Sequence, residues 1–182
     1  YQAWLVYAKL RAVYLFGDLA DYQAWVGRVA VVESSVPSHT KVPVAVMYAA
    51  LMRCRLAREA GAAAAQAHVA ELSRLRGRLA EWAAAGPANV AHRRALVEGE
   101  AAWLEGRSGE AMGWYERAVA LARVARCAPV EALATERAAA LAGAEGRAQE
   151  QALRKAEAQR LWRDWGADAC AARLSGEAAA PK

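Results

Sequence analysis

The chain has 182 residues, 24 of them basic and 19 acidic, which gives a formal net charge of +5. This length suits one globular domain or a short run of repeats, and the small positive excess permits a nucleic-acid partner without requiring one. Hydrophobic residues make up 57% of the chain, but the longest strongly apolar run, residues 42–52, is too short to span a bilayer. With no signal peptide visible, the sequence predicts a cytoplasmic location and no membrane partner.

The cysteines indicate the redox compartment of the chain, and the first residue indicates that the chain is part of a longer protein. Cys54, Cys127 and Cys170 are odd in number, widely scattered and without metal-ligand spacing, which predicts buried thiols in a reducing compartment. Tyr1 lies inside an apparent helix and is not preceded by an initiator methionine. We therefore expect a fragment of a longer protein.

Helical spacing of apolar residues runs along the whole chain, and no strand-like alternation appears. Alanine at this density favours helices, because it loses no side-chain entropy in them. Pro43 suits the first turn of a helix, and a loop rich in Ser, Thr and Pro is expected over residues 33–43. The predicted helices cover residues 4–16, 19–32, 43–58, 63–84, 90–105, 108–126, 129–143, 147–165 and 168–174.

The stretch from Gly99 to Ala118 predicts how the helices pack. It is typical of two antiparallel helices with a turn at Gly106. Small residues at Gly99 and Ala111 let two helix backbones approach closely. Tyr115 fills the space one turn further on, and Ala118 makes room for it. These five residues form the predicted hairpin seam, and a hairpin of this kind needs similar neighbours to bury its apolar face.

Single glycines mark the predicted turns at nearly regular distances. They stand at positions 17, 61, 106 and 146, so the gaps between them are 44, 45 and 40 residues. This period is longer than the 34 residues of a standard tetratricopeptide unit. We therefore predict an all-α fold, an α-solenoid of about four antiparallel helical hairpins over residues 1–174, followed by a flexible tail at 175–182.

From residue 79 onward the chain carries a more specific pattern. It contains LAEWAAAGPANVAHRRALVEGEAAWLEG, then EAMGWYERAVALA, EALATERAA and LWRDWGADA. This resembles the C-terminal tetratricopeptide-like region of large bacterial multidomain signalling ATPases. In those proteins a Ser/Thr kinase domain and an AAA/STAND-type ATPase precede the repeats, and GAF, histidine-kinase or cyclase domains sometimes follow. The residues that carry the resemblance are Trp82, Pro87, Asn89, His92, Glu98, Gly106, Glu110, Ala111, Tyr115, Ala118, Ala122, Glu131, Ala132, Leu133, Glu136, Trp165, Gly166 and Ala167.

The resemblance implies a helical-repeat fold and a regulatory role beside an ATPase or kinase. The chain departs from the family pattern at Arg126 and Cys127, where the pattern prefers Gly-Phe. It departs again at Gln151 and Lys155, where the pattern prefers small and apolar residues. The family's kinase, nucleotide-binding and phosphoacceptor motifs lie outside this region, so the resemblance implies no catalytic residue.

Three residues are candidates for a ligand groove: His92, Trp103 and Trp114. No Cys, His or Asp stands at metal spacing from His92, which favours a structural histidine over a ligand or a pH sensor. His39 and His68 are predicted to be solvated. Most tryptophans fit helix faces and are predicted to pack in the core, with one or two left to anchor a peptide on a concave face.

The charged clusters and glycines form no catalytic constellation. Glu98, Glu100 and Glu105 favour ordinary ion pairs over acid–base chemistry, because no nucleophile or metal ligand lies near them in the sequence. The arginines between residues 53 and 78 favour a solvated face or an acidic protein partner over nucleic acid. No phosphate-binding glycine motif or nucleophile elbow occurs. The sequence therefore predicts no catalytic residue, no cofactor and no metal.

Together these patterns predict a noncatalytic interaction and scaffold module that regulates a signalling ATPase or kinase. Its partner would be a peptide, a separate protein domain or the ATPase module of its own chain. The alternative is a small-molecule effector-sensing domain of a transcriptional or signalling regulator, which a deep apolar pocket with a few polar groups would favour. The sequence sets neither the ligand nor the oligomeric state.

Overall fold

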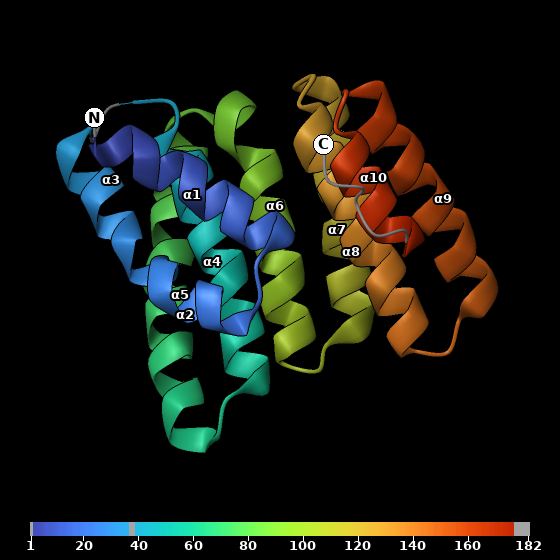
Figure 1. Cartoon of the computed structure of the whole chain (residues 1–182), viewed down its shortest axis with the longest axis horizontal. Coiled ribbons are helices and arrows are strands. Elements are labelled where there is room, and N and C mark those ends of the chain that lie inside the picture. The colour runs from blue at the N-terminus through green and yellow to red at the C-terminus, as the bar shows by residue number, and fades with distance from the viewer. Residues whose placement is uncertain (1, 37–38, 177–182) are drawn as a thin grey trace.

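The computed structural model describes residues 2–36 and 39–176, and their regular elements are all helical (Figure 1). This confirms the predicted all-α class. The elements in chain order are α1 (Gln2–Phe16), α2 (Leu19–Trp25), the 3-10 turn η1 (Val26–Arg28), α3 (Val29–Ser35), α4 (Val42–Glu59), α5 (Ala62–Ala85), α6 (Pro87–Leu104), α7 (Ser108–Val124), α8 (Ala128–Ala144), α9 (Ala148–Asp164) and α10 (Asp168–Ser175).

Helices pack in neighbouring pairs along the chain. From α4 to α10 each helix contacts the next, and α4, α6 and α8 also contact one another in that order. Because these three have neighbours on several sides, they are buried around most of their circumference, whereas α5, α7 and α9 bury a single stripe. At the other end, α1 and α2 lie across α4 (Figure 1).

Four turns of one kind connect the helices from α6 to α10. Each contains a residue of positive φ, at positions 106, 126, 146 and 166, so the turns recur every 20 residues. The next residue donates its N–H to a carbonyl five residues back, as Arg107 does to Ala102 at 2.8 Å and Cys127 to Ala122 at 2.8 Å. These hydrogen bonds satisfy the carbonyls that a helix end leaves free. One helix and its turn therefore form the repeating unit of this half.

The four predicted turn glycines all lie between helices, but those of the first half, Gly17 and Gly61, lack the positive φ of Gly106 and Gly146. Gly61 has a φ of −65° and stands before the first residue of α5, while Gly17 follows α1 and precedes Asp18, whose side chain caps α2. Neither turn has the geometry found at Gly106. Arg126 also has a positive φ, of 51°, and it stands at the position where the sequence departs from the glycine of the family pattern.

Two boundaries near residue 30 also differ from the predictions. The helix expected over residues 19–32 is broken by η1, which contains Gly27, a residue that weakens helices. The loop expected over residues 33–43 is shorter, because α3 continues to Ser35 and α4 begins at Val42. Residue 175, expected in the tail, belongs to α10, and residues 177–182 lie outside the described residues.

The residues of the predicted seam lie where α6 meets α7. Ala111, Tyr115 and Ala118 have no exposed surface. A Cβ placed on Gly99 would come within 2.6 Å of the Tyr115 ring, so the backbone of α6 approaches the ring as closely as a glycine allows. Gly106 lies in the turn between the two helices, with a φ of 76°.

Ala111→Leu should lower the free energy of unfolding by about 1–3 kcal/mol, because the larger side chain overpacks the contact between α6 and α7. Urea denaturation followed by circular dichroism measures the loss. The control is Ala120→Leu, an exposed position on the same helix. Equal unfolding midpoints for the two variants would contradict this placement of the seam.

Arg126→Gly should raise the free energy of unfolding by about 0.5–1 kcal/mol. Arg126 has a φ of 51°, where a residue with a Cβ loses about 1–2 kcal/mol that glycine does not, and the greater backbone entropy of glycine offsets part of the gain. Thermal unfolding measures the change. Arg117→Gly, within α7, should instead lower stability by about 1 kcal/mol. A destabilised Arg126→Gly variant would show that the arginine side chain makes a contribution larger than its backbone cost.

Candidate functional site

A buried ion pair joins the central helices. Glu100 of α6 has no exposed surface, and Arg137 of α8 is 8% exposed. The Arg137 Nε donates to the Glu100 Oε1 at 2.6 Å, and the Tyr115 hydroxyl donates to the same oxygen at 2.5 Å. Arg58 of α4 reaches the other carboxylate oxygen at 3.4 Å. Side chains from three other helices, α4, α7 and α8, therefore contact this single carboxylate of α6.

The surroundings of Glu100 hold it in the ionised form. Burial alone would raise the pKa of this carboxyl, but the charge and hydrogen bonds of Arg137, the charge of Arg58 and the Tyr115 hydroxyl hold the pKa below its usual value. Burial also disfavours the charged form of Arg137, yet Glu100 raises the pKa of its guanidinium well above the usual value. The pair is thus fully charged at neutral pH.

A second carboxylate lies one residue before Arg137 in α8. The Glu136 Oε2 accepts a hydrogen bond from the Trp162 Nε1 of α9 at 3.1 Å. Both carboxylate oxygens also accept from the Arg173 Nη2 of α10 at 2.8 Å. Glu100 and Glu136 therefore tie α4 and α10 to the central helices.

A polar cavity of about 230 Å³ opens beside these ion pairs. It lies between the α1–α2 connection and the helices α4, α8 and α10, and three of its lining side chains are arginines. Among the described residues, Arg55 has no carboxylate partner, and its guanidinium carbon lies 5.9 Å from the centre of the Tyr22 ring. The lining residues are Tyr14, Leu15, Phe16, Gly17, Tyr22, Arg55, Glu136, Arg137 and Arg173.

A larger and more apolar groove of about 540 Å³ lies between α1 and the turn that leads into α10. Two exposed aromatic side chains line it, Phe16 at 56% and Trp165 at 37% exposure. The guanidinium carbon of Arg11 lies 5.0 Å from the centre of the Trp165 ring. The groove therefore joins the first helix of the described chain to the last.

The three predicted groove residues do not share a cavity. Trp103 is partly buried, and its ring lies 4.5 Å from the guanidinium carbon of Arg58 and 5.1 Å from that of Arg137. Trp114 lines a shallow cavity on α7 that contains neither of the other two predicted residues. His92 is 2% exposed, and its Nε2 has no hydrogen-bond partner among the described residues.

His92 is neutral at neutral pH. Burial, with a contribution from the neighbouring charge of Arg93, lowers the pKa of its imidazole to about 4.

The prediction that His68 is solvated is wrong, because this side chain is buried and its Nδ1 lies 2.9 Å from the Arg53 Nη1. Arg53 belongs to α4 and His68 to α5, so no local pattern in the sequence reveals their contact.

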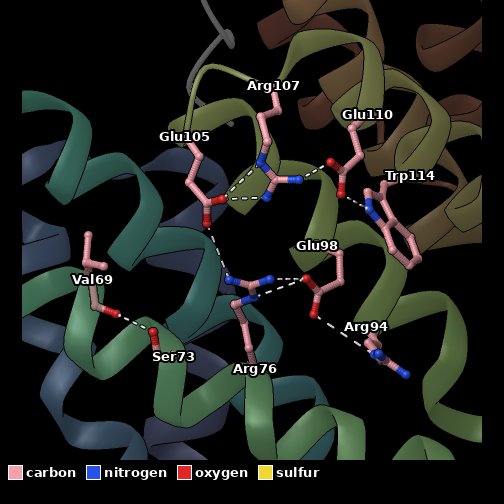
Figure 2. A network of polar contacts seen from close by, with 9 residues as sticks. All are labelled: Val69, Ser73, Arg76, Arg94, Glu98, Glu105, Arg107, Glu110 and Trp114. Carbon is pink, nitrogen blue, oxygen red and sulfur yellow. Dashed lines mark hydrogen bonds and ion pairs between the residues drawn. The ribbon is translucent and has the colours of Figure 1, made fainter.

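Figure 2 shows the ion pairs at the edge of α6. Arg76 of α5 contacts Glu98 and lies 3.5 Å from Glu105. Arg107 then joins Glu105 to Glu110, the first-turn carboxylate of α7. This confirms the expectation of ordinary ion pairs for Glu98 and Glu105. Glu100, on the same helix, is also ion-paired but is fully buried, which the sequence did not indicate.

Comparisons with models of protein families, with curated proteins and with solved structures found no match. No helix within residues 2–36 and 39–176 is long and apolar enough to cross a membrane. In the same part of the chain, no group of three or more His, Cys, Asp and Glu side chains has an arrangement that could hold a metal ion. The geometry of the two cavities is therefore the starting point for function.

Proposed function

We propose that this chain is a noncatalytic protein-interaction module, an α-solenoid of tetratricopeptide-like hairpins that regulates a bacterial signalling ATPase or kinase in the cytoplasm. The successive helix pairs, the close contact of α6 with α7 and the repeated turns support the solenoid architecture. The family resemblance of the second half of the chain supports the regulatory setting.

The observation that carries the proposal is the groove between α1 and α10. Phe16 and Trp165 are large apolar side chains that the fold leaves exposed beside a hollow, and such surfaces mark interaction sites. Aromatic side chains are also the residues that most often dominate binding energy at interfaces. Within the described chain, the Arg11 guanidinium has no carboxylate partner and stands on the same groove.

The partner that fits this groove is a peptide segment with an apolar side chain next to a carboxylate. Its apolar side chain would pack on Phe16 and Trp165, and its carboxylate would pair with Arg11. The segment comes from another protein or from another domain of the same polypeptide. Because the groove is formed by the first and last described helices, its occupation would favour one spacing of the two ends and so bias the activity of attached domains.

Selection of a displayed library of short random peptides on the purified protein tests the proposal. We expect enriched peptides that combine apolar and acidic residues, and we expect Phe16→Ser to weaken their binding by about tenfold. The control is Val124→Ser, which removes an exposed apolar side chain on α7, outside the groove. Failure to enrich peptides, or equal losses in the two variants, would overturn the proposed function.

A further inference from the structure

We propose that the polar cavity between the α1–α2 connection and α4, α8 and α10 binds a compact oxyanion of the phosphate class. The ligand is inorganic phosphate or the phosphoryl group of a small molecule. This site goes beyond the peptide-binding function proposed above and does not depend on it. It would supply the chain with a small-molecule ligand, as the effector-sensing alternative requires.

The first argument is the local balance of charge. Four guanidinium groups surround the cavity and the ion pairs beneath it, while only two carboxylates oppose them, so the cluster carries two excess positive charges. A phosphate near neutral pH carries between one and two negative charges and would neutralise this excess. The four arginines are Arg55, Arg58, Arg137 and Arg173, and the two carboxylates are Glu100 and Glu136.

The second argument is that the lining arginines keep donors free. Arg137 is more than nine-tenths buried and uses Nε and Nη2 for Glu100, so its Nη1 has no hydrogen bond to the described residues. Arg173 binds Glu136 through Nη2 alone. Arg55 donates to no side chain in the described part of the chain. Planar guanidinium groups with free donors are the side chains that recognise phosphate best.

The third argument is that the cavity is built by separate helices. Arg55 lies on α4, Arg137 on α8 and Arg173 on α10, and all three line the same 230 Å³ space. The ion pairs with Glu100 and Glu136 hold two of them in place, so their geometry is set before any ligand enters. This volume corresponds to about eight waters of the bulk liquid, which is room for a phosphate and a few waters.

Glu136 also lines the cavity, and its negative charge would repel an anion if it were unpaired. Both of its oxygens accept hydrogen bonds from Arg173, and Oε2 also accepts one from Trp162. The charge of this carboxylate is therefore already compensated. Tyr14 and Tyr22 also line the cavity and are themselves buried, so water screens the attraction between an arginine and an anion less here than at an open surface.

Calorimetric titration with sodium phosphate, at an ionic strength held constant with sodium chloride, tests the proposal. We expect saturable binding of inorganic phosphate, and Arg55→Gln should weaken it by about tenfold or more. The matched control is Arg117→Gln. Arg117 also lies over an aromatic ring, that of Trp114 at 5.4 Å, but lines a different cavity. Absence of saturable binding, or equal losses in the two variants, would overturn the proposal.

A second titration distinguishes the two sources of the phosphoryl group. Glycerol 3-phosphate that binds more tightly than inorganic phosphate, with the same dependence on Arg55, identifies an organic phosphate as the ligand. The reverse order identifies the free ion.

If Arg55→Gln does not fold, nitrogen-15 spectra of the wild-type protein replace the titration of this variant. Phosphate should then shift the Nε–H signals of Arg55, Arg137 and Arg173, and unchanged signals would contradict the site. Phe16 lines both cavities, but the two tests use different ligands, and Arg55 lines the phosphate cavity and not the peptide groove. Either proposal can therefore fail while the other stands.

Discussion

Glu100→Gln should lower the free energy of unfolding by about 3–5 kcal/mol, because removal of one partner leaves the other charge of a buried ion pair unpaired. The glutamine keeps the size of the side chain, so the loss reports charge rather than packing. Arg137 would remain almost fully buried without the carboxylate that accepts its Nε–H at 2.6 Å. Urea denaturation followed by circular dichroism measures the difference.

The control for Glu100→Gln is Glu110→Gln, which removes an exposed carboxylate paired with Arg107. Exposed ion pairs contribute about 0–1 kcal/mol, so this variant should be nearly neutral. The double variant Glu100→Gln/Arg137→Met should recover part of the loss, because it removes the unpaired charge. Equal effects of Glu100→Gln and Glu110→Gln would show that the interior pair contributes no more than a surface pair.

The contribution of Glu100 should also depend on pH. Its pKa is lower in the folded protein than its ordinary value of 4.5, so the stabilisation is fully present above pH 4.5 and is lost as the pH falls through the folded pKa. The difference between wild type and Glu100→Gln should therefore be constant near neutral pH and should shrink below pH 4.5. A difference that grows on acidification would contradict the assignment of a charged Glu100.

The helices and the seam could be predicted from sequence because their signals are local. Gly99 of α6 and Tyr115 of α7 stand within one hairpin, so local spacing indicated that this small residue lies against the Tyr115 ring. The prolines near the starts of α4 and α8 were equally local, whereas α6 begins at Pro87, three residues before its predicted start.

The ion pairs and cavities could not be predicted, because their members come from distant segments. Glu100 and Arg137 are 37 residues apart, and Glu136 and Arg173 are again 37 residues apart. One signal was available: Glu100 directly precedes the apolar stretch AAWL in α6, and Arg137 directly precedes AAALAGA in α8. A charged residue within an apolar helix needs a partner, but the sequence did not show which helix supplies it.

Deletion of residues 147–182 should abolish cooperative unfolding or cause aggregation. The deletion removes α9, which packs against α8, and α10, which packs against α9. It also removes Trp162, which has no exposed surface, and leaves Glu136 without the Trp162 and Arg173 hydrogen bonds. Terminal units of a stacked helical array shield the apolar face of the unit before them. Size-exclusion chromatography and a urea titration measure the outcome.

A pair of point variants tests the same contact without shortening the chain. Trp162→Ala should lower the free energy of unfolding by about 3–5 kcal/mol, the usual range for a large aromatic residue removed from a core. Trp114→Ala is the control, because this tryptophan is only partly buried and its Nε1 donates to the exposed Glu110 (Figure 2). Trp114→Ala should lower the free energy of unfolding by clearly less than Trp162→Ala does. If the truncated protein stays monomeric and unfolds cooperatively, and Trp162→Ala costs no more than Trp114→Ala, then α9 and α10 do not stabilise the helices before them. In that case α10 would not hold Arg173 in a fixed position beside the polar cavity, and the full chain should not bind phosphate.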